Sequence, residues 1–400
     1  MKQQDTTEPG SAPSRRQFLR RGGLLTLGGA GVPLLSFAGS ACAPAPAPAA
    51  APQVTAPAAA KQAWEDEWDR TLAAARREGK VTVLTITGIG FRKGLDAFQE
   101  AFPGIAVEHS AIASASIYAP KVMQEQQAGI YGWDIAVTGA ASNVKILYPA
   151  GAWDPIRPLL FRPDVISDDN WHGGFPVGFV DNNKQLGFTF SFDLRRAFAV
   201  NTDLVKDGEI KNLQDLLNPR WKGKMVLADV RTGFMFRPAD EIRRKLGEGP
   251  LKQLLVDQEP TYTRDLRQLA DGLIRGKYPI AGGLTPPDLQ EFRDQGLATN
   301  IRYLDIPEAD YLVSTTAFHF KRAPHPNAAK ILANWLLTKE AQTIWSKALN
   351  QNSRRKDVPI VQPLTAPRPG MQFVNPETEE TLPQIDQTQV IINKMVGISN

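Results

Sequence analysis

The stretch Val81-Thr82-Val83-Leu84-Thr85-Ile86 decides the fold class of this 400-residue chain. Its β-branched, apolar composition is typical of a buried strand. Residues 64–78 before it carry apolar side chains at helical spacing, and Gly79 is placed to end that helix. After a turn at 87–90, a second helix is expected to bury Leu95, Phe98 and Phe102. A strand between two helices is the repeating unit of a parallel α/β sheet.

The same alternation of strand and helix continues along the chain in two series. In the first series, strands are expected at 105–107 and 133–137, with a helix at 121–128 between them. The second series has strands at 197–201, 225–229, 279–283 and 301–304, with helices at 237–247, 249–257, 263–275 and 287–294. Two series of similar size, without detectable sequence repetition, predict two lobes with separate cores.

The rest of the chain completes the expected domain organisation. From residue 323 the pattern is helical again, with Pro326 at a first helical position and Thr338 as an N-cap. Residues rich in Pro, Gln and Thr follow and predict an irregular tail. The boundaries expected are lobe 1 at 63–196 and again at 310–358, lobe 2 at 197–309, and the tail at 359–400.

Residues 1–41 have the features of an export signal. Arg15 and Arg16 precede an uncharged stretch from Gly22 to Ala38. That stretch is shorter than the roughly 20 apolar residues that a membrane span needs. The pattern resembles a twin-arginine signal, the type read by machinery that exports folded proteins. This segment carries five basic and two acidic residues, so it accounts for most of the net charge of +4, and a nucleic-acid partner is not expected.

Cys42 is the only cysteine of the chain, so no intramolecular disulfide is possible. The segment Gly39-Ser40-Ala41-Cys42 resembles a bacterial lipobox, in which the cysteine is lipidated and becomes the mature amino terminus. Ala41-Cys42-Ala43 is alternatively an Ala-x-Ala site for ordinary cleavage. The segment that follows is almost entirely Ala and Pro, which predicts an extended tether at 42–62. We therefore expect an exported protein held at the outer face of the cytoplasmic membrane by a lipid on Cys42.

Four segments, in their order and spacing, resemble the type 2 periplasmic solute-binding proteins, especially the subgroup labelled iron(III)-type. They are Ala73–Val81 (AAARREGKV), Phe198–Val205 (FAVNTDLV), Asn212–Met225 (NLQDLLNPRWKGKM) and Ala323–Gln342 (APHPNAAK to EAQ). The resemblance implies two α/β lobes joined by crossing strands, with the chain leaving lobe 1 near 195 and returning near 310. It also implies a monomer without a cofactor, which clamps a small ligand between its lobes and delivers it to an ABC permease.

Enzymatic alternatives have less support in the sequence. The chain contains no G-x-S-x-G elbow, no H-E-x-x-H motif and no Walker loop. Gly88-Ile89-Gly90 does not continue into a dinucleotide fingerprint, because Lys93 stands where the third glycine is needed. An enzyme is therefore not expected. An exported α/β hydrolase or transferase and a lipid-anchored ligand sensor remain as alternatives.

Candidate ligand-binding residues follow from the rule that ligands sit beyond the carboxyl ends of parallel strands. Four loops occupy such ends, at 87–90, 138–142, 229–233 and 282–285, and all are rich in Gly, Ser or Thr. Arg231 is the sharpest candidate, as a forked donor to a carboxylate or phosphate, with an ion pair to Asp229 as the alternative. The candidates are Thr87, Gly88, Gly90, Thr138, Gly139, Ala140, Ser142, Asp229, Arg231, Thr232, Gly283, Thr285 and Tyr311.

The identity of the ligand depends on whether iron is expected. A ferric ion needs oxygen donors such as tyrosinate and carboxylate, with His. Iron-binding members of the subgroup carry adjacent tyrosines, whereas here Tyr262, Tyr278, Tyr303 and Tyr311 are single, and His109, His172, His319 and His325 lack metal-ligand spacing. We therefore expect an organic or phosphorylated anion, with ferric iron as the alternative.

Two arginine pairs lie near the expected hinge and after the last helix. Arg195 and Arg196 are expected to be solvated or paired. Arg354 and Arg355 are expected to form a solvated charge run, with a position at the ligand cleft as the alternative.

Overall fold

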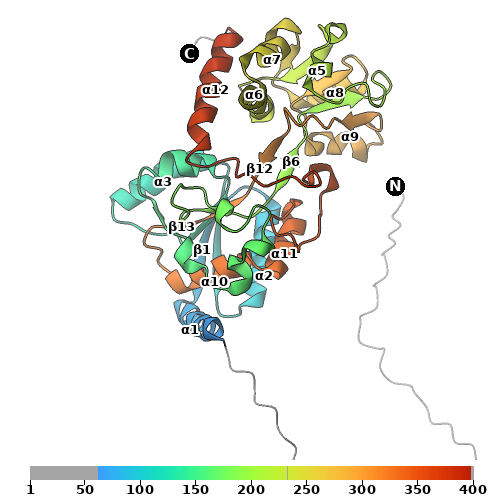
Figure 1. The fold of residues 1–400 in the computed structure, drawn as a ribbon. Coiled ribbons are helices and arrows are strands. Elements are labelled where there is room, and N and C mark those ends of the chain that lie inside the picture. The colour runs from blue at the N-terminus through green and yellow to red at the C-terminus, as the bar shows by residue number, and fades with distance from the viewer. Residues whose placement is uncertain (1–61, 232, 398–400) are drawn as a thin grey trace, which may run out of the picture. The chain divides into compact units, whose positions relative to one another are not determined.

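A computed structural model describes residues 62–231 and 233–397 of the chain (Figure 1). Strand and helix alternate along most of these residues, so the predicted α/β class is confirmed. No helix within the two ranges is long and apolar enough to cross a bilayer. The expected export signal, Cys42 and nearly all of the Ala/Pro tether lie outside the described residues.

The first sheet has the strand order β2-β1-β3-β13-β4, and β5 also pairs with β13. β1 runs parallel to β2 and β3, whereas β13 runs antiparallel to β3. The parallel pairing expected for the first series of strands is therefore confirmed, and β13 joins the sheet antiparallel because the chain re-enters it from the opposite direction. The strands are β1 (Lys80–Ile86), β2 (Ala106–Ile112), β3 (Ile135–Thr138), β4 (Trp153–Asp154), β5 (Phe188–Thr189) and β13 (Thr316–Phe320).

Helices from both ends of the folded chain cover the first sheet. Phe98 of α2 packs with Trp335 of α10 and Trp345 of α11 in one buried cluster. α1 ends at Gly79, whose φ of 76° lets its N–H bond to Ala75. The helices are α1 (Ala63–Glu78), α2 (Ile89–Ala101), α3 (Ala115–Gln127), α4 (Pro163–Ile166), α10 (Pro326–Leu336) and α11 (Lys339–Leu349).

The predicted starts of the two closing helices are confirmed. α10 begins with Pro326. Proline has no backbone N–H, and none is needed at this position, because the N–H groups of the first turn have no partner within the helix. The side chain of Thr338 accepts a hydrogen bond from the N–H of Ala341 and so caps α11.

The second sheet has the strand order β11-β7-β10-β8-β9, with its own hydrophobic core. β8, β9 and β10 are parallel, and β7 runs antiparallel to both β10 and β11. The strands are β7 (Phe198–Asn201), β8 (Met225–Ala228), β9 (Thr261–Thr263), β10 (Ile280–Gly282) and β11 (Ile301–Tyr303). The helices are α5 (Leu213–Leu216), α6 (Gly233–Leu246), α7 (Glu248–Lys252), α8 (Leu266–Ile274) and α9 (Gln290–Asp294).

Two short antiparallel strands, β6 (Asp193–Arg195) and β12 (Tyr311–Val313), carry the chain between the sheets (Figure 1). β6 leads directly into β7, whose first residue pairs with Gly282 at the carboxyl end of β10. β12 leads directly into β13, whose first residue pairs with Thr138 at the carboxyl end of β3. In both sheets, therefore, the carboxyl edge of the parallel strands adjoins the crossing pair.

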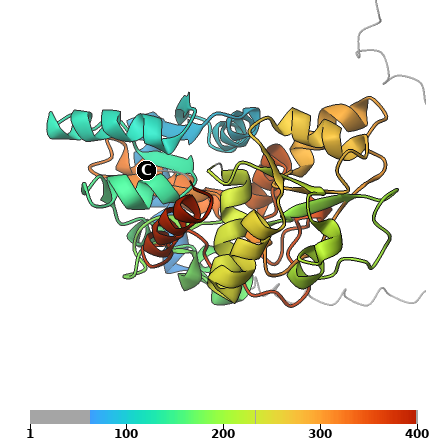
Figure 2. The same cartoon turned by 90° about the horizontal axis from the view of Figure 1, so that it is seen from above.

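The expectation of an irregular tail over 359–400 is wrong for its last part. Thr381–Met395 forms the helix α12, which lies beside α6 (Figure 2). Pro383 is tolerated because it stands in the first turn, where backbone N–H groups have no partner within the helix. Leu382 and Ile385 pack into a buried cluster of the first sheet, and Ile392 packs into the core of the second.

Candidate functional site

Buried hydroxyl groups line the carboxyl edge of the first sheet. Thr138 ends β3 and lies opposite Thr316 at the start of β13. The Oγ1 atoms of Thr316 and Thr189 lie 2.9 Å apart. All three threonines are buried. Sequence reasoning identified only Thr138, because it followed the parallel strands and did not consider antiparallel strands that reach the same edge from the other side.

The loop at 138–142 holds a carboxylate in this structure. The N–H groups of Ala140 and Ala141 donate to Oε2 of Glu377 at 3.0 and 3.1 Å. The carbonyl of Gly139 accepts from Nδ2 of Asn143 at 2.6 Å, which orders the loop from beneath. Ser142 lies half-buried in the same loop. The two N–H groups thus point toward an anionic oxygen, as expected of a loop that recognises an anion.

The loop at 87–90 has a structural reason for its glycines. Gly88 precedes α2 with a φ of 154°, and Thr87 beside it is exposed. A Cβ atom on Gly90 would lie 2.2 Å from the carbonyl oxygen of Ala348 in α11. Close packing of α2 on α11 therefore explains Gly90 without any ligand.

At the carboxyl end of β8, Asp229 and Arg231 bind one another. Asp229 accepts hydrogen bonds from the backbone N–H of Arg231 at 3.0 Å and from its Nε at 2.7 Å, and Arg264 adds a further bond at 2.8 Å. The bond from Arg231 holds the pKa of the Asp229 carboxyl well below its usual range. The guanidinium of Arg231 is thus engaged in the ion pair that the sequence offered as the alternative to ligand binding. Thr232 lies outside the described residues.

The loop after β10 is tight and internally bonded. Gly283 has a φ of 85°, and a Cβ there would lie 2.8 Å from the Cβ of Ala228. The backbone N–H and Oγ1 of Thr285 both donate to Oδ2 of Asp288, at 2.7 and 2.6 Å. Thr285 therefore fixes the direction of Asp288.

Asp288 belongs to a polar cluster that sequence reasoning missed. Burial raises the pKa of both Tyr303, at the end of β11, and Tyr311, on β12. Arg195 lowers and Asp288 raises the pKa of both hydroxyls, so the two tyrosines share one electrostatic neighbourhood. Arg237 of α6 also acts on Tyr311. The two tyrosines are eight positions apart in sequence, and the tertiary structure gives them Arg195 and Asp288 as shared charged neighbours.

Unsatisfied groups occur in the same region. Within the described residues, the buried hydroxyls of Tyr303 and Ser314 have no hydrogen-bond partner. Buried polar atoms are rarely left in this state, so a bound solute or water is the expected partner.

The histidines do not form a metal site. Within residues 62–231 and 233–397, no three His, Cys, Asp or Glu side chains are grouped so as to hold a metal ion. His109 bonds to Thr85 at 2.8 Å, and His325 bonds to Asp134 at 2.8 Å. These two imidazoles therefore have structural partners in the first lobe.

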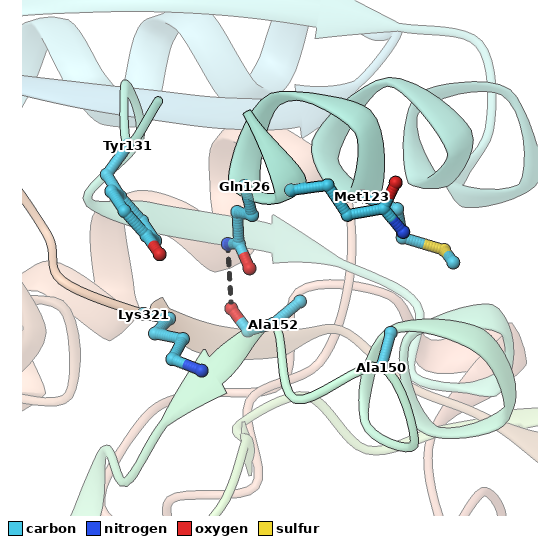
Figure 3. Close-up of a pocket in the computed structure, with 7 residues that line it drawn as sticks. Met123, Gln126, Tyr131, Ala150, Ala152 and Lys321 are labelled. Atoms are coloured by element: carbon cyan, nitrogen blue, oxygen red, sulfur yellow. Dashed lines mark hydrogen bonds between the residues drawn. The ribbon is translucent and has the colours of Figure 1, made fainter. Parts of the chain in front are cut away.

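A pocket of about 140 Å³ lies at the opposite edge of the first sheet (Figure 3). Lys321, which follows the far end of β13, and Tyr131 point into it, and Gln126 bonds to the carbonyl of Ala152 at 3.2 Å. A larger pocket of about 450 Å³ lies between segments 353–360 and 367–372. Neither pocket includes the strand-end loops.

The expectation that Arg354 and Arg355 form a solvated charge run is wrong, because both side chains are buried. Arg354 donates to carbonyl oxygens of His172, Gly174 and Thr189 at 2.8–3.2 Å and lies over the rings of Trp171, Phe188 and Phe373. Burial lowers its pKa to about 9. Carbonyl oxygens and aromatic faces replace the water that a cation needs.

Arg355 and Arg196 both have carboxylate partners. Arg355 bonds to Asp357 at 2.9 Å and to backbone carbonyls. Arg196 pairs with Asp305 at 3.4 Å, as expected of a paired hinge arginine.

Residues 182–348 match the family described as bacterial extracellular solute-binding protein. Over these residues the chain is similar to bacterial extracellular solute-binding proteins. No curated protein matches the sequence.

Solved structures of several binding proteins share the two-lobed fold of this chain. The Trichodesmium protein IdiA (FutA), solved in complex with iron and citrate, has a TM-score of 0.62 at 17% identity over 79% of this chain and 99% of its own. The ferric binding protein from Campylobacter jejuni has a TM-score of 0.57 at 17% identity, over 79% and 98%. A putative extracellular solute-binding protein from Bordetella parapertussis has a TM-score of 0.62 at 13% identity, over 80% and 99%. At these identities, the likeness establishes the type 2 fold.

Proposed function

We propose that this protein is a solute-binding protein, which captures a small organic or phosphorylated anion at the strand-end edges that adjoin β6 and β12 and delivers it to an ABC permease. The chain binds its solute and does not convert it. Hinge motion at the crossing pair would signal occupancy to the permease. Within this proposal, residues 63–196 and 310–358 form one lobe and 197–309 the other.

The observation that carries the proposal is the carboxylate held by the N–H groups of Ala140 and Ala141. It supports a carboxylate or a similar anionic group as what this loop accepts from a solute. Across the crossing strands, Arg195 and Arg237 supply positive charge near the hydroxyl of Tyr311. The backbone N–H groups of the 138–142 loop and the guanidinium groups of Arg195 and Arg237 are both suited to binding a carboxylate or phosphate.

Ferric iron, carried as an anionic chelate, is the second candidate. It is favoured by the shared neighbourhood of Tyr303 and Tyr311, since tyrosinate oxygens are suitable ligands for a hard ferric ion. The Trichodesmium protein of the same fold was solved with iron and citrate. A ferric chelate would need both tyrosines to lose their protons on binding.

Export and anchoring complete the proposal. Arg15 and Arg16 would direct twin-arginine export, and Cys42 would carry the lipid anchor at the outer face of the membrane. The Ala/Pro segment that follows would hold a monomeric folded domain away from the bilayer. Intact mass of the membrane-associated protein tests the anchor, because lipidated Cys42 adds acyl mass whereas cleavage after Ala43 removes the cysteine.

A thermal-shift screen tests the ligand class, with citrate, inorganic phosphate, ferric citrate, a neutral sugar and a polyamine as the probes. A ligand at a hundredfold its dissociation constant adds about 2.7 kcal/mol to the free energy of unfolding. We expect stabilisation by an anion or by its ferric complex. Stabilisation by the sugar or polyamine alone would contradict the proposal, and release of a product from the bound compound would identify an enzyme.

A further inference from the structure

The C-terminal strap, defined as residues 366–397, is bound to both parts of the fold. Near its start, Nε of Arg368 donates to Asp305 at 2.6 Å, and Arg368 also pairs with Asp310 at the start of the crossing strand β12. Farther along, Nδ2 of Asn375 donates to the carbonyl of Gly178 at 3.2 Å and to Oγ1 of Thr189 at 3.1 Å. The strap therefore runs from the crossing pair to the hydroxyl-lined edge of the first sheet.

The next residues place a carboxylate on the predicted solute loop. Glu377 accepts the N–H groups of Ala140 and Ala141. Glu379 fixes the strap immediately afterwards: its N–H donates to Val180 at 2.8 Å, and its carboxylate accepts the N–H of Asn182 at 3.0 Å. Bonds on both sides of Glu377 keep its side chain over the loop.

The final helix of the strap ties the first lobe to the second. Asp386 pairs with Lys145 in the first lobe. Two residues later, Oγ1 of Thr388 donates to Asp240 at 2.5 Å and accepts from Nε of Arg243 at 2.6 Å, both on α6. A displacement of the strap thus affects contacts in both lobes.

We propose that the strap is an intramolecular competitor of the solute: Glu377 occupies the loop at 138–142 until an anionic solute displaces it. The inference rests on the proposed function, because it assumes that this loop binds the solute. A tethered group reaches effective concentrations in the millimolar range, so even a weak internal carboxylate competes with micromolar solute. The strap sets the concentration at which the protein begins to load.

Isothermal titration of the full chain with citrate and with inorganic phosphate tests the competition. Glu377→Ala removes the competitor, and we expect the dissociation constant of a bound anion to fall by roughly tenfold. Glu380→Ala is the matched control, because it removes an exposed carboxylate of the same strap that lies three residues away. The control is expected to change the dissociation constant by less than about twofold, through long-range charge alone.

The outcomes separate the inference from the proposed function. Tighter binding by Glu377→Ala but not by Glu380→Ala supports both. Equal dissociation constants for the wild type and Glu377→Ala would overturn the strap and leave the proposed function intact. Binding of neither probe to any of these proteins would overturn both. If Glu377→Ala does not fold, Glu377→Gln, which keeps the shape and removes the charge, decides by the same criteria.

Discussion

Arg195 on β6 lies opposite Tyr311 on β12, in the antiparallel pair that carries the chain between the two sheets. The guanidinium lowers the pKa of the Tyr311 hydroxyl, against the larger effect of burial, which raises it. The pair also adjoins Thr138 and Gly282, through the first residues of β13 and β7. The crossing strands β6 and β12 thus lie next to strand ends of both sheets and carry the guanidinium of Arg195.

Removing this cation should weaken anion binding. We expect Arg195→Ala to raise the dissociation constant of the bound anion by roughly 10- to 150-fold, because a hydrogen bond to a charged group contributes about 1.5–3 kcal/mol. Isothermal titration measures the change. Arg275→Ala, which removes an equal charge from an exposed side chain, should leave the constant unaltered. Equal effects of the two variants would show that Arg195 acts only through net charge.

Much of the fold could be predicted from local patterns. A few neighbouring residues are enough to predict the strand at 81–86, the end of the first helix at Gly79 and the cap at Thr338. The structure has the predicted elements at all three places. The pairing of β13 with β3 could not be predicted in this way, because it depends on the direction in which the chain returns from the second sheet.

The candidate site was less accessible to sequence reasoning. Loops at parallel strand ends follow from their position in the chain. Tyr303 and Tyr311 stand as separate residues in the sequence, and only the tertiary structure gives them Arg195 and Asp288 as shared charged neighbours. Glu377 lies more than two hundred residues from the loop that it contacts. The sequence predicts a solvated Arg354, because a pair of adjacent arginines gives no indication of the carbonyls and rings that surround this side chain.

Arg354 should be essential for stability. Arg354→Met leaves three carbonyl oxygens of the first lobe without their donor, and we expect a loss of about 3 kcal/mol or more in the free energy of unfolding. Urea denaturation measures the loss. The exposed Arg275→Met provides the comparison, and its unfolding midpoint should match that of the wild type. A wild-type midpoint for Arg354→Met would mean that the carbonyls find other partners.

The buried carboxyl group of Asp193 should make the stability of the protein depend on pH. Burial raises its pKa to about 6, although Asn352 and Thr365 donate to its carboxyl group. A raised pKa means that the folded state binds the proton more tightly, so this contribution is complete below about pH 4 and is lost as the pH rises through 6.

Asp193→Asn should remove that dependence, since the amide resembles the protonated carboxyl and cannot ionise. Between pH 4 and pH 8 the wild type should lose about 3 kcal/mol of unfolding free energy that Asp193→Asn keeps, so the difference between variant and wild type should rise by that amount. Urea titrations at the two pH values measure this difference. Glu380→Gln at an exposed position is the control, and a difference for Asp193→Asn that does not vary with pH would refute the assignment.

The last helix should contribute to the stability of the second core. Ile392 is fully buried there, so Ile392→Ala is expected to cost about 2–5 kcal/mol of unfolding free energy. Val390 on the same helix is 59% exposed, and Val390→Ala should have a much smaller effect. Thermal or urea unfolding distinguishes the two. Equal, small effects would show that α12 does not pack on the second core in solution.

Hydrogen–deuterium exchange of the full chain, with and without a stabilising anion, tests most directly whether solute binds where the strand ends adjoin the crossing pair. The account predicts slower exchange in peptides that cover 138–142, 283–285 and 303–313. Protection confined to the pocket around Met123 and Lys321, or exchange unaltered across all three peptides, would contradict it.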